Sequence, residues 1–221
     1  MPKFILIFVI FSMSLNHLAS KQCDSCKADF DILLKIREKS KVSLSDIQRS
    51  WQITNKLYKL RYTDYIDSVI NKTENVSHSL TKTFSDICIN ADSKLGVDYY
   101  LQYLNLTKGS VEEERSLSLE RLFARYPETL LKAIGKDNDL LDDISWGFQN
   151  NRLYGAVNPF EGYDYTAMLL NEKSMKPILN KDNCKAIFFE TYPVLSENYL
   201  KYKYQIDYII NSTIESLEVS E

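Results

Sequence analysis

The stretch SDIQRSWQITNKLYKLRYTDYIDSVI, residues 45–70, decides the fold of this chain. Residues of one face recur in it at steps of mostly three and four, which is the repeat of an α-helix. Ser45 and Gln48 have the spacing of a capping box at its start. We therefore predict an amphipathic helix of about 25 residues, whose inward face consists of Ile47, Trp51, Thr54, Tyr58, Tyr62, Tyr65, Ile66, Val69 and Ile70.

Helical patterns continue along most of the chain, which has no glycine before Gly96 and no proline between Pro2 and Pro127. Glycine and proline are the residues that most often interrupt helices. No stretch alternates at period two between turn residues, so strands are at most incidental. We predict an all-α fold, an irregular helical bundle or short helical array of about seven to eight helices. The further helices are expected over residues 27–39, 80–88, 97–106, 110–126, 129–134, 140–148, 183–190 and 196–217.

Several helix ends are marked by particular residues. Ser110 and Glu113 have the spacing of a second capping box, and Asp137 or Asn138 is expected to cap the helix over residues 140–148. The sequence Phe-x-x-Tyr-Pro occurs at residues 123–127 and again at 189–193. Each copy is expected to end one helix and begin the next, because proline is tolerated at the first helical position. The pair indicates either a duplicated helical hairpin or a generic boundary.

The first twenty residues have the order of a secretory signal peptide. Lys3 precedes an apolar run over residues 4–13, and small residues follow at Ala19 and Ser20. The apolar core is about ten residues, whereas a membrane span needs roughly 20. We expect residues 1–20 to be removed, leaving residues 21–221 as a single helical domain that is exported, either periplasmic or secreted. No later segment has the length and apolarity of a membrane span.

Charge and histidine content exclude several classes of function. The chain has 27 basic and 30 acidic residues, a formal net charge of −3, and lacks the basic face that nucleic acid requires. After residue 20 the one histidine is His78, so a histidine-pair metal site is excluded. There is no Gly-x-Ser-x-Gly elbow and no phosphate-binding glycine loop. We predict no metal, no cofactor and no nucleic-acid partner.

A cluster of four aspartates, at positions 137, 139, 142 and 143, is the remaining metal-like pattern. Counted from Asp137, the sixth and twelfth places of a calcium loop hold Asp142 and Phe148 instead of glycine and glutamate. We therefore interpret the cluster as a helix cap followed by a solvated acidic turn.

Four cysteines follow the predicted signal peptide: Cys23, Cys26, Cys88 and Cys184. An even number in an oxidising compartment predicts disulfides, although the sequence leaves all three pairings open. We favour Cys88–Cys184, because closing a loop of roughly 100 residues stabilises by about 4–5 kcal/mol in the chain-entropy model. The Cys23/Cys26 spacing also occurs in redox dithiols, but no βαβ pattern surrounds it. We expect a disulfide-stapled fold.

Four asparagines lie in the triplet that accepts N-linked glycans. They are acceptors if the chain passes through a eukaryotic secretory pathway. Their positions are Asn71, Asn75, Asn105 and Asn211.

Residues 149–165 form the segment in which a binding site is expected. Helical periodicity lapses there, glycines occur, and aromatic side chains alternate with polar ones. Loops held on a rigid scaffold are where binding residues concentrate, and Tyr and Arg suit sugar or protein surfaces. The candidate binding residues are Arg152, Tyr154, Asn158, Glu161, Tyr163 and Asp164.

The sequence names no biochemical function, but it ranks the classes. The leading hypothesis is a non-catalytic, extracytoplasmic helical binding module whose partner is a protein, peptide or glycan. One alternative is a carboxylate-based hydrolase with Glu161 or Asp164 as acid or base. The other is a thiol–disulfide protein that uses the Cys23/Cys26 pair. The absence of recognisable catalytic motifs favours a protein that is not an enzyme.

Overall fold

The computed structural model of the chain describes residues 25–60, 79–108, 112–153 and 180–218. These residues are mostly helical, and among them there is no strand. The prediction of an all-α fold is confirmed. The helical segments in these ranges outnumber the seven or eight expected, because residues 149–153 are helical where a loop was predicted and two helices replace the one predicted over residues 196–217.

The helices follow one another with short connections. A first helix covers residues 25–37. The others are α2 (Leu44–Lys59), α5 (Leu80–Ile89), α6 (Ser93–Leu106), α7 (Glu112–Arg125), α8 (Pro127–Ile134), α9 (Asn138–Phe148), the π-helix η2 (Gln149–Leu153), α11 (Lys181–Thr191), α12 (Pro193–Glu197) and α13 (Lys203–Glu218).

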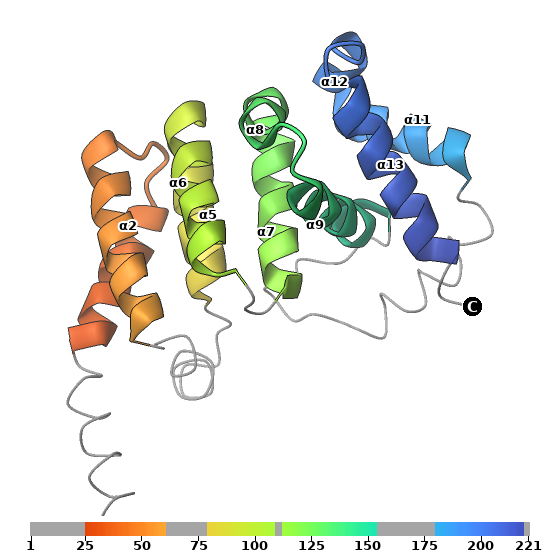
Figure 1. Cartoon of the computed structure of the whole chain (residues 1–221). Coiled ribbons are helices and arrows are strands. Elements are labelled where there is room, and N and C mark those ends of the chain that lie inside the picture. The colour runs from red at the N-terminus through yellow and green to blue at the C-terminus, as the bar shows by residue number, and fades with distance from the viewer. Residues whose placement is uncertain (1–24, 61–78, 109–111, 154–179, 219–221) are drawn as a thin grey trace, which may run out of the picture.

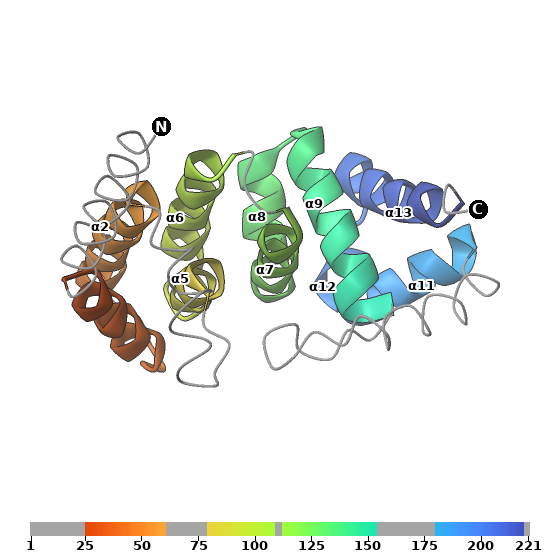
Figure 2. The same ribbon diagram turned by 90° about the horizontal axis from the view of Figure 1, so that it is seen from below.

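Neighbours along the chain are also neighbours in space (Figure 1). Helix α2 packs on α5 and α6, α5 on α7, α7 on α9, and α9 on α13, which also contacts α11. The view from below shows the same order from α2 to α13 (Figure 2). In such an arrangement each helical hairpin depends mainly on the ones beside it, and the grooves between hairpins lie at the surface.

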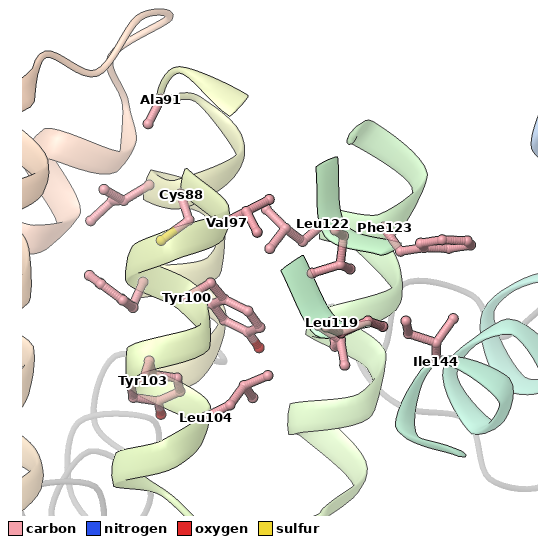
Figure 3. Close-up of a cluster of buried hydrophobic side chains, with 14 of the residues drawn as sticks. Cys88, Ala91, Val97, Tyr100, Tyr103, Leu104, Leu119, Leu122, Phe123 and Ile144 are labelled. Carbon is pink, nitrogen blue, oxygen red and sulfur yellow. The ribbon is translucent and has the colours of Figure 1, made fainter. Parts of the chain in front are cut away.

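Aromatic and aliphatic side chains fill the seam between α5, α6 and α7 (Figure 3). Tyr100 and Tyr103 of α6 are fully buried, as are Leu119 and Leu122 of α7. Burying one large apolar side chain contributes about 1.5–3 kcal/mol, so the seam is a main source of stability. The Tyr103 hydroxyl is satisfied by Thr81, at 2.6 Å between the two oxygens.

The helix predicted from Ser45 is shorter, and its N-cap lies two residues earlier than predicted. Ser43 is its N-cap and forms the capping box with Asp46, so the predicted Ser45/Gln48 box is wrong. The Ser43/Asp46 box is favoured over the Ser45/Gln48 box because the Asp46 carboxylate also pairs with Lys39, 2.7 Å away. The neutral amide of Gln48 cannot form an ion pair. Helix α2 ends at Lys59; residues 61–70 of the predicted helix lie outside the described residues.

Gly96 lies inside α6 and does not precede it. The predicted start at residue 97 is wrong because Gly96 is where α6 touches α5. A β-carbon at this position would lie 2.2 Å from the Cys88 carbonyl oxygen, so only glycine permits the contact.

The two Tyr-Pro boundaries are confirmed. Tyr126 (φ −135°, ψ 55°) and Tyr192 (φ −125°, ψ 68°) have nearly the same backbone conformation, and a proline opens the next helix in each case. The helix predicted over residues 196–217 is instead divided into α12 and α13. In both regions a long helix, a short helix and a returning helix follow one another. Duplication of the hairpin stays a hypothesis.

The predicted Cys88–Cys184 disulfide is wrong, and the fold is not stapled through these residues. Both are buried free thiols. Cys88 belongs to α5 and Cys184 to α11, and α7 and α9 lie between these two helices in both views (Figures 1 and 2). Cys26 is buried in the first helix, whereas Cys23 lies outside the described residues.

Thiol labelling without reductant should separate the two arrangements. Burial raises the pKa of the Cys88 thiol well above its ordinary value and that of Cys184 to about 11. Both should therefore resist N-ethylmaleimide in the native chain and react in guanidinium chloride, as measured by peptide mass spectrometry. Failure to react in the denaturant until a reductant is added would mean that they are disulfide-bonded.

Candidate functional site

A polar groove lies where α7, α9 and α13 meet. Its volume is about 430 Å³, within the roughly 300–1,000 Å³ typical of ligand pockets. We call it the α9–α13 groove. Its lining residues are Ser116, Asp142, Asp143, Ser145, Trp146, Gln149, Ser212 and Ser216.

The groove follows from the helical repeat of two segments that are far apart in sequence. Asp142, Ser145 and Trp146 lie at steps of three and four along α9, and Gln149 continues the same side into η2. On α13, Ser212 and Ser216 are one helical turn apart. The opposite side of α9 is apolar and carries the fully buried Leu141, Ile144 and Phe148. Packing of that apolar side turns the polar side of α9 toward α13.

Hydrogen bonds across the groove fix its walls. Asp142 accepts from Tyr208 at 3.1 Å and from Ser212 at 2.7 Å, which joins α9 to α13. Deeper in the seam, the Ser145 and Thr213 hydroxyls are 2.8 Å apart. Ser216 donates to the Gln149 side-chain oxygen at 2.8 Å. The groove is therefore preformed, with its walls linked by side chains from both helices.

The α7 side of the groove is built around Asp143. This carboxylate accepts from Ser116 at 2.8 Å and pairs with Arg115 at 2.9 Å. Asp137 caps α9 as predicted, accepting from the Leu140 N–H. Asp142 and Asp143, however, join helices, so the interpretation of all four aspartates as a cap and a solvated turn is wrong for these two. The inward steps of α9 bring them against α7 and α13.

A fully buried carboxylate, Glu120 of α7, lies beneath η2. Its oxygens accept from the Arg152 Nε at 2.9 Å, from the Asn151 side-chain amide at 2.7 Å, and from the Tyr192 hydroxyl. Burying a charge is costly unless it is paired and hydrogen-bonded, and Glu120 has both kinds of partner. We call these four residues the Glu120 network.

Electrostatics within the Glu120 network favour the protonation states that these bonds need. Burial lowers the pKa of the Arg152 guanidinium, but the Glu120 carboxylate more than offsets this, so the pKa is raised. Burial, together with Glu120, raises the pKa of Tyr192 well above its ordinary value. Arg152 therefore stays charged and Tyr192 stays protonated as donors to Glu120.

Aromatic rings hold Tyr192 in place from the other side. The ring centroids of Phe123, Phe148 and Phe188 lie 4.7, 5.8 and 4.9 Å from that of Tyr192. Tilted and edge-on ring pairs of this kind add to the stability gained by burying their area. The cluster links α7, α9 and α11 directly beside Glu120.

Of the six residues predicted as a binding site, the structure describes Arg152. Arg152 lies in η2, with its side chain 38% exposed and its guanidinium bonded to Glu120. Tyr154, Asn158, Glu161, Tyr163 and Asp164 lie outside the described residues. Asn105 and Asn211 are exposed on α6 and α13, and Asn71 and Asn75 lie outside the described residues.

Sequence reasoning missed Glu120, Asp142 and Ser212. Glu120 stands between Leu119 and Phe123 on the inward stripe of α7, and a carboxylate at such a position indicates a buried, paired charge. That pattern was sufficient to single it out. Nothing in the local sequence of Asp142 or Ser212 indicates that they meet, because 70 residues separate them.

The residues that the structure describes contain neither a group arranged as a metal site nor a helix suited to span a membrane. In these ranges no group of three or more His, Cys, Asp or Glu side chains is arranged to hold a metal ion. No helix there has the length and apolarity needed to cross a bilayer. Comparison of the chain with protein-family models, curated proteins and solved structures found no match.

Gly147 is expected to be essential for the close packing of α9 on α7. A β-carbon there would lie 2.5 Å from the Ser116 carbonyl oxygen and 2.6 Å from the Glu120 Cβ. Gly147→Ala should lower the free energy of unfolding by about 1–3 kcal/mol, since backbone has to move. Urea unfolding followed by circular dichroism measures this.

Gly135→Ala is the control for Gly147→Ala, because a β-carbon at Gly135 has no heavy atom within 4 Å. Its cost comes only from the backbone conformation of φ 59° and ψ −114°, which non-glycine residues rarely adopt, and is about 1–3 kcal/mol with no clash added. Equal stability of Gly147→Ala and the wild type would contradict the packing described here.

The Glu120–Arg152 pair should matter more than an exposed ion pair. Arg152→Ala leaves the Glu120 carboxylate buried without its cation. We expect a loss of about 2–3 kcal/mol, below the roughly 3–5 kcal/mol of a fully buried pair, because water reaches half-exposed Arg152. Combining it with Glu120→Met should recover part of the loss, since no unpaired charge remains.

Lys201→Ala, which removes the exposed pair with Glu128, is the control. It should have a much smaller effect on the unfolding midpoint in urea than Arg152→Ala. Similar effects of the two variants would contradict a structural role for the Glu120 network.

Proposed function

We propose that this chain is a non-catalytic binding module that acts outside the cytoplasm and holds its partner in the α9–α13 groove. The observation that carries the proposal is the groove itself: a cavity of about 430 Å³ whose walls are linked by hydrogen bonds between α9 and α13. A preformed site binds at lower entropic cost than one that must be ordered.

The position of the groove also connects it with the segment singled out in the sequence. Gln149 lines the groove and is the first residue of the segment 149–165. Arg152, in the same π-helix, is anchored on Glu120. π-helical turns occur frequently at functional sites, because they redirect the side chains that follow. A ligand in the groove would therefore lie at the start of that segment.

The chemistry of the groove supports binding over catalysis. A general acid or base needs a carboxylate or imidazole within reach of a reacting group, usually beside a nucleophile that it activates. Asp142 is held by Tyr208 and Ser212, and Asp143 by Ser116 and Arg115. These bonds make the two carboxylates fixed acceptors that orient a ligand.

Location outside the cytoplasm is part of the proposal and comes from the amino-terminal sequence. Lys3, the apolar run over residues 4–13 and the small residues at 19 and 20 support it. Buried Cys88 and Cys184 are compatible with an oxidising compartment, because buried thiols with raised pKa values react slowly.

Parallel ligand selections should test the groove as the binding site. The purified chain is screened against a displayed random-peptide library and a glycan array, beside Ser212→Phe, whose ring fills the groove. Ser196→Phe places the same ring on an exposed position of α12 as the control. Ligands of the wild type should bind Ser212→Phe at least about ten-fold more weakly and Ser196→Phe unchanged.

Circular dichroism of both variants confirms that they are folded before binding is compared. If the selected ligands bind Ser212→Phe as tightly as the wild type, the binding surface lies elsewhere. If the chain turns over a glycan or peptide in the screen, the non-catalytic assignment is wrong.

A further inference from the structure

We infer that the α9–α13 groove binds a cationic side chain, the ammonium of a lysine or the guanidinium of an arginine, presented by a partner polypeptide. The inference rests on the proposed function and names the ligand class of the same groove. The hydrogen-bonding groups that the groove has already used internally determine which ligand groups it can still bind.

The hydroxyl hydrogens of the groove are committed to internal acceptors. Ser212 donates to Asp142 and Ser116 to Asp143. Thr213 donates to the Ile209 carbonyl, so the hydrogen between Ser145 and Thr213 comes from Ser145. Each hydroxyl has a single hydrogen, so none of these serines has a hydrogen left for a ligand. Ser116 and Ser145 are themselves buried, whereas partly exposed Ser212 offers a ligand its oxygen lone pairs.

Ser216 and Tyr208 extend the same pattern. Ser216 donates toward the Gln149 oxygen and the Thr213 carbonyl. Burial and the Asp142 charge raise the pKa of Tyr208, which keeps its proton for the bond to Asp142. Apart from the Gln149 amide and the Trp146 indole N–H, the lining therefore presents acceptors.

A groove of acceptors fits a ligand group made only of donors. The lysine ammonium has three N–H donors and the arginine guanidinium five, and neither has an acceptor. A sugar hydroxyl can donate its one hydrogen here as well, but the acceptor lone pairs on its oxygen would find few donors in the groove. The Asp142 carboxylate has room for about four hydrogen bonds, of which Tyr208 and Ser212 use two.

The charges around the groove point the same way. Among the described residues, Asp143 pairs with Arg115, and no ion pair there involves Asp142. Glu215 of α13, between Ser212 and Ser216 in sequence, is exposed and acidic. Lys203 of α13 is paired with Asp207 and lies about two and a half helical turns from Ser212. The described residues thus give the groove a net negative charge, and fields of this kind steer cations toward it.

Trp146 supplies the remaining surface. Its side chain is partly exposed and lines the groove beside Asp142 and Asp143. An indole face attracts ammonium and guanidinium groups more strongly than the other aromatic rings do. Carboxylates and an indole lying one helical turn apart along α9 suit a cation with an aliphatic stem.

The two tryptophans of the chain make the test site-specific. Trp146 lies in the groove, whereas Trp51 contacts Phe84 and Tyr99 in the α2–α5–α6 part. With 5-fluorotryptophan the chain gives one ¹⁹F signal from each, assigned with Trp51→Phe. The full chain is titrated with acetyl-Ala-Lys-Ala-Lys-Ala-amide and its arginine counterpart, and with two controls: the Nε-acetyl-lysine form and maltotriose.

Both cationic peptides should shift the Trp146 signal saturably and leave Trp51 unchanged. Raising NaCl from about 0.1 to about 0.5 M should weaken binding, because the contact is ionic. Asp142→Asn keeps the shape but removes the charge and should weaken binding at least about five-fold. Glu215→Gln, exposed on α13, should weaken it less, and Asp98→Asn, exposed on α6, should have no effect.

Two results overturn the inference and differ in what they say of the proposed function. If maltotriose or the acetylated peptide shifts Trp146 as strongly as the cationic peptides, the groove binds ligands but not as a cation site. If no cationic peptide shifts Trp146, the cation inference fails. The library screen with Ser212→Phe then decides separately whether the groove binds anything else.

Discussion

The close approach of α9 to α7 at Gly147 is the contact on which the rest of the site depends. With no β-carbon at this position, the α9 backbone reaches the Ser116 carbonyl and the Glu120 side chain. That approach places Asp143, one helical turn before Gly147, beside Ser116. It also places η2, which follows α9, beside Glu120. A side chain at position 147 would separate the helices and weaken both the groove and the Glu120 network.

The Glu120 network shows how a costly group can specify an arrangement. Its partners come from η2, one turn after α9, and from Tyr192, which is 72 residues away. A buried ion pair is a weak source of net stability, but leaving either partner unpaired is expensive. In the observed arrangement of α7, η2 and α11 the Glu120 carboxylate has its hydrogen-bond and ion-pair partners. An arrangement without them would leave the charge unpaired among apolar rings.

Much of the fold could be predicted from local pattern, and much of the site could not. The helical period located the inward face that carries Ile47, and the Tyr-Pro pairs located two boundaries, because these depend on residues near in sequence. The Cys88–Cys184 pairing was wrong because loop entropy says nothing of where the helices place the thiols. Asp142 and Ser212 meet only through the packing of α9 on α13.

The α9–α13 seam joins stability to recognition through the same side chains. A hydroxyl that donates across the seam to a carboxylate holds two helices together and at the same time turns its lone pairs outward. Ser212 does this toward Asp142, whereas Ser116, which donates to Asp143, is itself buried. Because the hydroxyl hydrogens of such a seam are used in the bonds that join its helices, mainly acceptors remain for a ligand. Its preference for a donor-only cation therefore needs no residue placed for binding alone, except Trp146, whose partly exposed indole supplies the apolar wall.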